Sequence, residues 1–125
     1  MPTYPPAILS LGTAEYQRGR IAQGRKLFRS LLSLPRKTKD ICQIVDEAGM
    51  FLTRMKAYKD GMELYRDAVK RYPDVAALFQ GLGYCASAAG LHEEAVPANQ
   101  RAEKMEQLPS EAPFSKRFEE VVGQA

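Results

Sequence analysis

The chain has 125 residues, of which 45% are hydrophobic and 26% charged, and its formal net charge is +3. This balance is typical of one globular domain and excludes a disordered or fibrous chain. No apolar run approaches the ~20 residues that a membrane-spanning helix requires. Residues 1–6 lack the basic and apolar segments of a signal peptide. We therefore expect a cytoplasmic protein.

The residue types that build metal and redox sites are scarce. Cys42 and Cys85 are the only cysteines, and His92 is the only histidine. Two distant cysteines lack the ligand spacing of a zinc site. We expect two small buried or half-buried thiols, a histidine at a turn or helix start, no metal and no cofactor.

Three segments in chain order each predict a pair of helices. Residues 5–37 begin with two prolines that suit a first helical turn and continue through a turn at Gly19. Residues 38–73 carry the same pattern up to Pro73. Residues 74–109 repeat it with a turn at Gly90, and Pro97 lies early in the last helix. Residues 110–125 follow as a seventh helix, whose apolar stripe is Phe114, Phe118, Val121 and Val122.

A glycine recurs at the same phase of the three segments, at Gly12, Gly49 and Gly83. The spacings are 37 (49 − 12) and 34 (83 − 49) residues, in the range of stacked helical repeats. A glycine inside a helix costs about 1 kcal/mol relative to alanine, so its recurrence predicts close helix packing. The predicted contacts are Gly12 with Gly24, Gly49 with Gly61 and Ala68, and Gly83 with Ala95 and Ala102. Nine larger residues are predicted to fill the core: Leu11, Phe28, Leu31, Val45, Leu52, Tyr65, Val69, Phe79 and Leu82.

This pattern resembles the tetratricopeptide repeat (TPR) family over about residues 5–109. The resemblance implies an all-α fold, a right-handed α-solenoid of three helix hairpins, with residues 110–125 as a capping helix or the start of a further unit. Glu15, Ala86 and Asn99 depart from the family pattern, because they replace residues that are usually aromatic.

In this family the first helix of each unit lines a concave groove that holds an extended peptide. The resemblance therefore implies a non-catalytic adaptor, scaffold or chaperone. Tyrosine and methionine are common anchors at binding surfaces, although the two tyrosines of this set could simply cover the edge of the core. Transferred residue by residue, the groove set is Leu9, Thr13, Tyr16, Gln17, Gln43, Asp46, Met50, Thr53, Gln80, Tyr84 and Ser87, with Arg54 and Ala77 as further candidates.

Some members of the family hold an acidic C-terminal tail through a clamp of Lys, Asn and Arg. The corresponding positions here are Leu9, Thr13, Glu47, Ala77 and Gly81. None of these residues can pair with a terminal carboxylate. We therefore expect no clamp of that kind in the groove.

Basic residues gather in the first 39 residues, which carry eight basic residues and one acid. A basic surface is predicted on the second helix and the connection after it: Arg25, Lys26, Arg29, Arg36, Lys37 and Lys39. The simplest interpretation of this surface is a solvated helix face. The alternative interpretation is a function, the binding of nucleic acid or an acidic partner.

Two further alternatives concern assembly and a narrower family. The chain could self-associate through exposed ends of the repeat. Residues 79–85 are also similar to the matching unit of the repeat chaperones of type III secretion translocators. No nucleophile elbow, phosphate loop or metal-binding pair is present, so we do not expect an enzyme.

Overall fold

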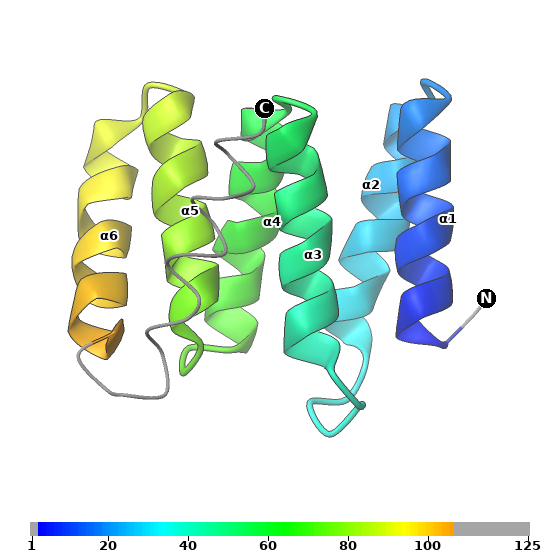
Figure 1. The fold of residues 1–125 in the computed structure, drawn as a ribbon, viewed down its shortest axis with the longest axis horizontal. Coiled ribbons are helices and arrows are strands. Elements are labelled where there is room, and N and C mark those ends of the chain that lie inside the picture. The colour runs from blue at the N-terminus through cyan, green and yellow to red at the C-terminus, as the bar shows by residue number, and fades with distance from the viewer. Residues whose placement is uncertain (1–2, 107–125) are drawn as a thin grey trace. The chain divides into compact units, whose positions relative to one another are not determined.

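The computed structural model describes residues 3–106, which form six α-helices, one short 3-10 helix and no strand. This confirms the all-α prediction for the described part of the chain (Figure 1). The predicted helix over residues 110–125 lies outside the described residues. The elements are α1 (Pro5–Gln17), α2 (Ile21–Ser30), η1 (Leu31–Ser33), α3 (Ile41–Arg54), α4 (Tyr58–Arg71), α5 (Ala76–Ala88) and α6 (His92–Glu106).

The helices fall into two compact units, which we describe separately. Unit 1 comprises Met1–Ala48 and unit 2 comprises Gly49–Ala125, so the boundary lies inside α3. None of the described helices is long and apolar enough to cross a membrane.

The turn inside each helix hairpin is the same Schellman motif, made three times. The residue two positions after the last helical residue has a positive φ: +85° at Gly19, +60° at Lys56 and +83° at Gly90. This confirms the turns predicted at the two glycines. An L side chain in this left-handed region costs roughly 1–2 kcal/mol, so the lysine is the exception. The closing backbone bonds run from the amides of Arg20, Ala57 and Leu91 to the carbonyls of Glu15, Leu52 and Ala86, at 2.9, 2.9 and 2.8 Å.

Unit 1 is held together by the packing of α1 against α2. The first turn of α1 contains both prolines, as predicted. A Cβ placed on Gly24 would lie 3.1 Å from the carbonyl oxygen of Gly12, which confirms the predicted close approach of these two glycines. The Phe28 ring fills the space beside Gly12, because a Cβ there would lie 2.6 Å from Phe28 Cε1. Leu11, predicted in the core, is instead 47% exposed because it lies on the solvent side of α1.

Unit 2 is organised around α5, which packs against both α4 and α6. Small residues let these helices approach closely: Ala76, Ala77, Gly81, Gly83, Cys85 and Ala86 are all buried. Pro97 lies inside α6, which nevertheless continues to Glu106, and His92 is its first residue as expected.

The atoms nearest to Gly49, Gly81 and Gly83 belong to larger side chains that were not among the predicted contacts of the repeat glycines. The Tyr65 ring, which is fully buried, lies against both Gly49 and Gly81. A Cβ on either glycine would lie 2.3 or 2.2 Å from Tyr65 Cζ, respectively. The side-chain amide of Asn99 lies beside Gly83, because a Cβ there would lie 2.0 Å from Asn99 Oδ1.

Both cysteines are free thiols, as predicted, with Cys42 half-buried and Cys85 buried. Cys85 Sγ lies 3.4 Å from the Thr53 hydroxyl, which donates a hydrogen bond to the Gly49 carbonyl at 2.9 Å. The thiol is therefore the donor to the Thr53 oxygen. Burial raises the pKa of Cys85 to about 11, so this thiol stays protonated.

A bidentate ion pair links α4 to α6. The Arg66 guanidinium donates to the Glu94 carboxylate at 2.8 and 2.7 Å, and this hydrogen bond lowers the pKa of Glu94. The two side chains are 38% and 28% exposed. Solvent screening therefore limits the contribution of the pair to about 1 kcal/mol or less.

We expect Glu94→Gln to lower the free energy of unfolding by up to ~1 kcal/mol at pH 7. Because Glu94 has a lower pKa in the folded state, its ionised form stabilises the fold at pH values above its unfolded-state pKa of about 4.3. This contribution is lost as the pH falls through the folded-state pKa. Urea unfolding of both proteins at a series of pH values from pH 7 into acid should therefore show a difference that shrinks as the pH falls below the unfolded-state pKa of about 4.3. A difference that stayed constant throughout the acid range would contradict the assignment to charge pairing.

Candidate functional site

The exposed face of α5 carries three of the predicted groove residues. Gln80, Tyr84 and Ser87 are spaced by four and three residues, which places them on one side of the helix. Ser87 is exposed, whereas the other two are half-buried. The Gln80 amide donates a hydrogen bond to the carboxylate of Glu106 in α6. The remaining sides of α5 are used in packing, so this face is the part of α5 that can meet a ligand.

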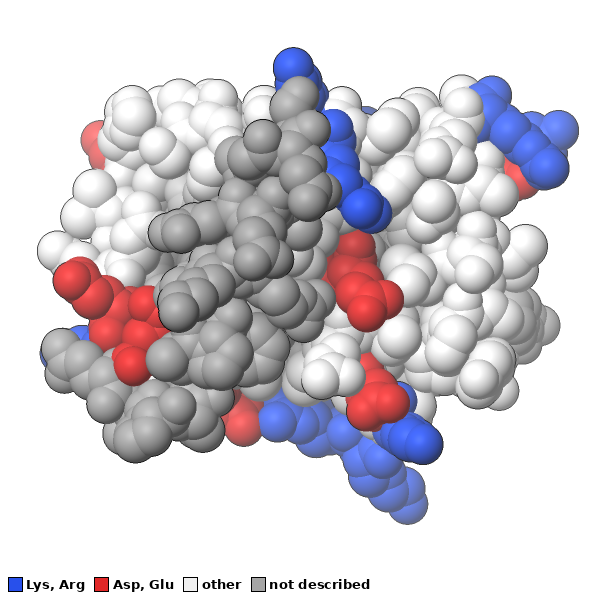
Figure 2. All heavy atoms as spheres, viewed as in Figure 1, with Lys and Arg blue, Asp and Glu red and all other residues white. Residues whose placement is uncertain are grey.

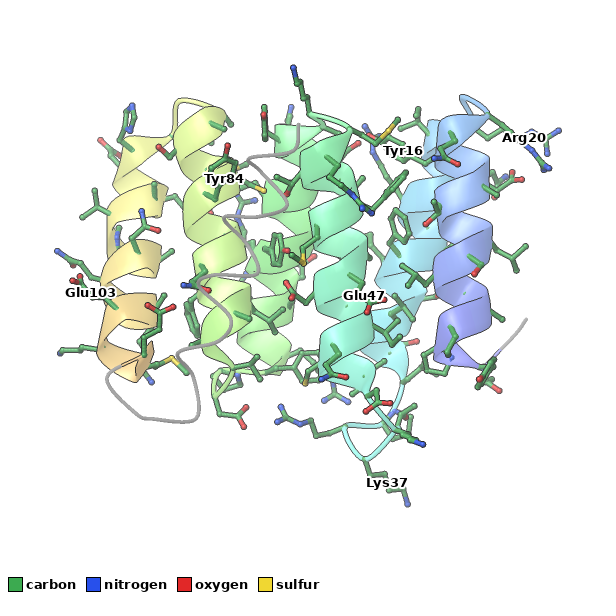
Figure 3. All side chains as sticks on the ribbon, in the orientation of Figure 1. Tyr16, Arg20, Lys37, Glu47, Tyr84 and Glu103 are labelled. Atoms are coloured by element: carbon green, nitrogen blue, oxygen red, sulfur yellow. The ribbon has the colours of Figure 1, made fainter. Side chains whose placement is uncertain are left out.

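Tyr84, which is labelled in Figure 3, forms an aromatic pair with Tyr58, the first residue of α4. The ring centroids lie 6.2 Å apart and the ring planes are tilted by 59°, and this centroid distance is within the range of favourable aromatic pairs. Burial, and then the nearby Tyr58, raise the pKa of Tyr84 above its usual value. The Tyr84 phenol is therefore protonated at neutral pH.

The other two predicted groove residues of unit 2 are core residues. Met50 is 5% exposed and Thr53 is 2% exposed. Because the Thr53 hydroxyl is bonded to the Gly49 carbonyl and the Cys85 thiol, its observed role is packing between α3 and α5.

The predicted groove residues of unit 1 also divide by burial. Gln17 and Gln43 are exposed, and Leu9 and Thr13 are half-buried. The Thr13 hydroxyl donates to the Leu9 carbonyl at 2.8 Å. Tyr16 and Asp46 are buried, at 7% and 5% exposure. Among the predicted groove residues of unit 1, the exposed polar side chains are therefore those of Gln17 and Gln43.

All six residues of the predicted basic surface are exposed. Figure 2 shows basic side chains at the loop before α3, where Figure 3 labels Lys37. Lys26, Lys37 and Lys39 contact no carboxylate within residues 3–106. Arg18 and Arg20, outside this surface, lie 3.5 and 3.4 Å from Glu15.

The sequence reasoning missed several residues beside the Tyr58–Tyr84 pair. The turn before α4 exposes Arg54, Met55 and Lys56, and Lys59 is exposed in the first turn of α4. Of these, only Arg54 was among the candidates. A usable signal was present, because the other two hairpin turns carry glycine where this one carries lysine.

No group of three His, Cys, Asp or Glu side chains that could hold a metal ion occurs in the described part of the chain. Comparisons with protein-family models, with curated proteins and with solved structures found no match.

Proposed function

We propose that this chain is a non-catalytic, TPR-like module that binds an extended segment of a partner protein along the exposed face of α5. The observation that carries the proposal is the Tyr84 ring, half-buried against Tyr58 and flanked on the same helical face by Gln80 and Ser87. A rigid aromatic side chain with polar neighbours is a frequent anchor for protein partners. Three hairpins with one turn geometry and spaced glycines support the resemblance to TPR units.

Affinity capture from native lysate, followed by mass spectrometry, tests this proposal. Three baits are needed: the unmodified chain, Ser87→Arg and the control Val96→Ala. Ser87 is exposed on the proposed face, and Val96 is 52% exposed on α6, so neither change disturbs the core. Asp46 is unsuitable for such a variant because it is buried.

We expect a partner protein that the unmodified chain and Val96→Ala retain, and that Ser87→Arg retains at least ten-fold less. A ten-fold loss of affinity corresponds to about 1.4 kcal/mol of binding free energy, which is within the range observed when an anchor contact of an interface is lost. Identical retention by all three baits would contradict the proposal.

A second candidate function, the binding of nucleic acid or another anionic partner, is favoured by the exposed basic surface of unit 1. Its three lysines that lack a described carboxylate neighbour are available to phosphates. In a gel-shift assay at low salt, single-stranded RNA should be retarded by the unmodified chain. The triple variant Lys26→Glu, Lys37→Glu, Lys39→Glu should abolish that shift. Absence of binding by the unmodified chain at low salt would eliminate this function.

A further inference from the structure

The turn between α3 and α4 departs from its two counterparts in one residue. All three turns close with the same pair of backbone hydrogen bonds, and glycine suffices for this in two of them. The third turn places Lys56 in the left-handed region, at φ +60°. Its backbone bonds do not need a lysine side chain, so folding alone gives no reason for the strain. Strain of this kind often marks a functional position.

The surroundings of Lys56 combine positive charge with apolar and aromatic surface. Arg54 and Lys59 are also exposed, and Met55 is 45% exposed. Tyr58 follows Lys56 by two residues, and its ring contacts that of Tyr84 in α5. We call these six residues the basic aromatic corner: Arg54, Met55, Lys56, Tyr58, Lys59 and Tyr84.

The charges of the corner are not neutralised by the residues that the structure describes. Arg54, Lys56 and Lys59 form no ion pair within residues 3–106. Residues 49–62 carry these three basic residues and one acid, Asp60, so their net charge is 3 − 1 = +2. Consecutive Cα atoms are 3.8 Å apart, which keeps all three basic Cα atoms within ~15 Å of the Cα of Tyr58. The three charges therefore lie within the length of one short peptide segment from Tyr58.

The ring geometry favours a protein segment over a nucleic acid. A base is held best on an open ring face, and in single-strand binders successive bases stack on such faces. Here the rings are tilted by 59° and packed against each other, and Tyr84 is half-buried. Met55 offers a flexible thioether that adapts to aromatic and aliphatic side chains.

We propose that the basic aromatic corner binds an acidic segment of a partner protein, with an aromatic or aliphatic side chain of that segment placed on Tyr58, Tyr84 and Met55. This inference rests on the proposed function and specifies the chemistry of its partner. The basic groups lie outside the positions of the terminal-carboxylate clamp. A free C-terminus on the partner is therefore not required.

The test is fluorescence-polarisation titration of the full chain with a labelled, C-terminally amidated peptide that alternates Asp and Glu with Phe and Leu. Matched peptides replace the acids with Lys, replace the Phe and Leu with Ala, or carry a free C-terminus. We expect the first two to bind at least ten-fold more weakly than the parent, and the free-acid peptide to bind as well as the parent. Added salt should weaken parent binding.

Lys56→Gly separates binding from folding. It removes both the charge and the strained side chain, so the melting temperature should equal or exceed that of the unmodified chain. Peptide affinity should fall by about two- to five-fold, the effect of one exposed charge. Lys56→Glu should weaken binding further, whereas the control Lys104→Glu, on exposed α6 surface, should leave it unchanged.

Three outcomes would overturn the inference. The first is equal affinity of the acidic peptide for the unmodified chain, Lys56→Glu and Lys104→Glu. The second is binding of single-stranded RNA but not of the acidic peptide at the corner. The third is tighter binding of a peptide of residues 107–125 than of the acidic probe, which would identify the chain's own C-terminal segment as the ligand of the corner. If the inference fails while Ser87→Arg still releases a captured partner, the proposed function stands and only the partner's chemistry is wrong.

Discussion

Replacing Gly81 with alanine is expected to destabilise unit 2 by about 2 kcal/mol, although alanine is the better helix former. The new Cβ would lie 2.2 Å from Tyr65 Cζ, inside the contact distance of any two carbon atoms. The ring cannot yield easily, because it is fully buried and its other side lies against Gly49. The gain of about 1 kcal/mol in helix propensity is therefore outweighed by overpacking. Urea unfolding followed by circular dichroism measures the loss.

A double-mutant cycle shows whether the Tyr65 ring causes this effect. Tyr65→Leu alone leaves a cavity and should cost several kcal/mol. In the double variant Gly81→Ala, Tyr65→Leu, the added methyl group enters part of that space. The combined loss should therefore be smaller than the sum of the single losses by about 1 kcal/mol or more. Additive losses would show that the helix contact, rather than the ring, sets the cost.

The Cys85 thiol is expected to react with a thiol reagent at least ~100-fold more slowly than an unfolded cysteine at pH 7.5. The thiolate is the reactive form, and burial raises the pKa of Cys85 from an ordinary value of 9.0 to about 11. The shift alone lowers the thiolate fraction by about two orders of magnitude. Full burial of the side chain slows reagent access as well.

The measurement uses Cys42→Ser, which leaves Cys85 as the sole thiol, and Cys85→Ala as the matched single-thiol control. Half-buried Cys42 should react readily in the folded control, and both thiols should react fast in urea. Rapid reaction of folded Cys42→Ser would contradict the buried contact between Cys85 and Thr53.

The helices and two of the three hairpin turns could be predicted because their signals are local. Pro5 and Pro6 mark the first turn of α1, and Gly19 and Gly90 mark the turns after α1 and α5, whereas the turn between α3 and α4 has neither glycine nor proline. The partners of the glycines could not be predicted in the same way. Tyr65 reaches Gly49 and Gly81 from a different helix, and no local pattern distinguishes a glycine that admits a ring from one that admits another glycine.

The candidate site was predictable only in part, for a related reason. A helical register identifies the side of a helix but not how deeply each position is covered. Asp46 and Met50 occupy the same positions relative to Gly49 as Leu9 and Thr13 do relative to Gly12, yet the first two are buried and the last two are half-buried. The role proposed for Lys56 became visible only when three turns of the same geometry could be compared.

Site-specific photo-crosslinking tests the central claim, that the exposed face of α5 holds a partner segment, most directly. A photoreactive amino acid is placed at Ser87 on α5 or, as the control, at Gln100 on exposed α6, and intact cells are irradiated. We expect one discrete crosslinked partner protein from position 87 and none from position 100. A partner crosslinked from position 100 but not from position 87 would show that the exposed face of α5 is not the binding surface.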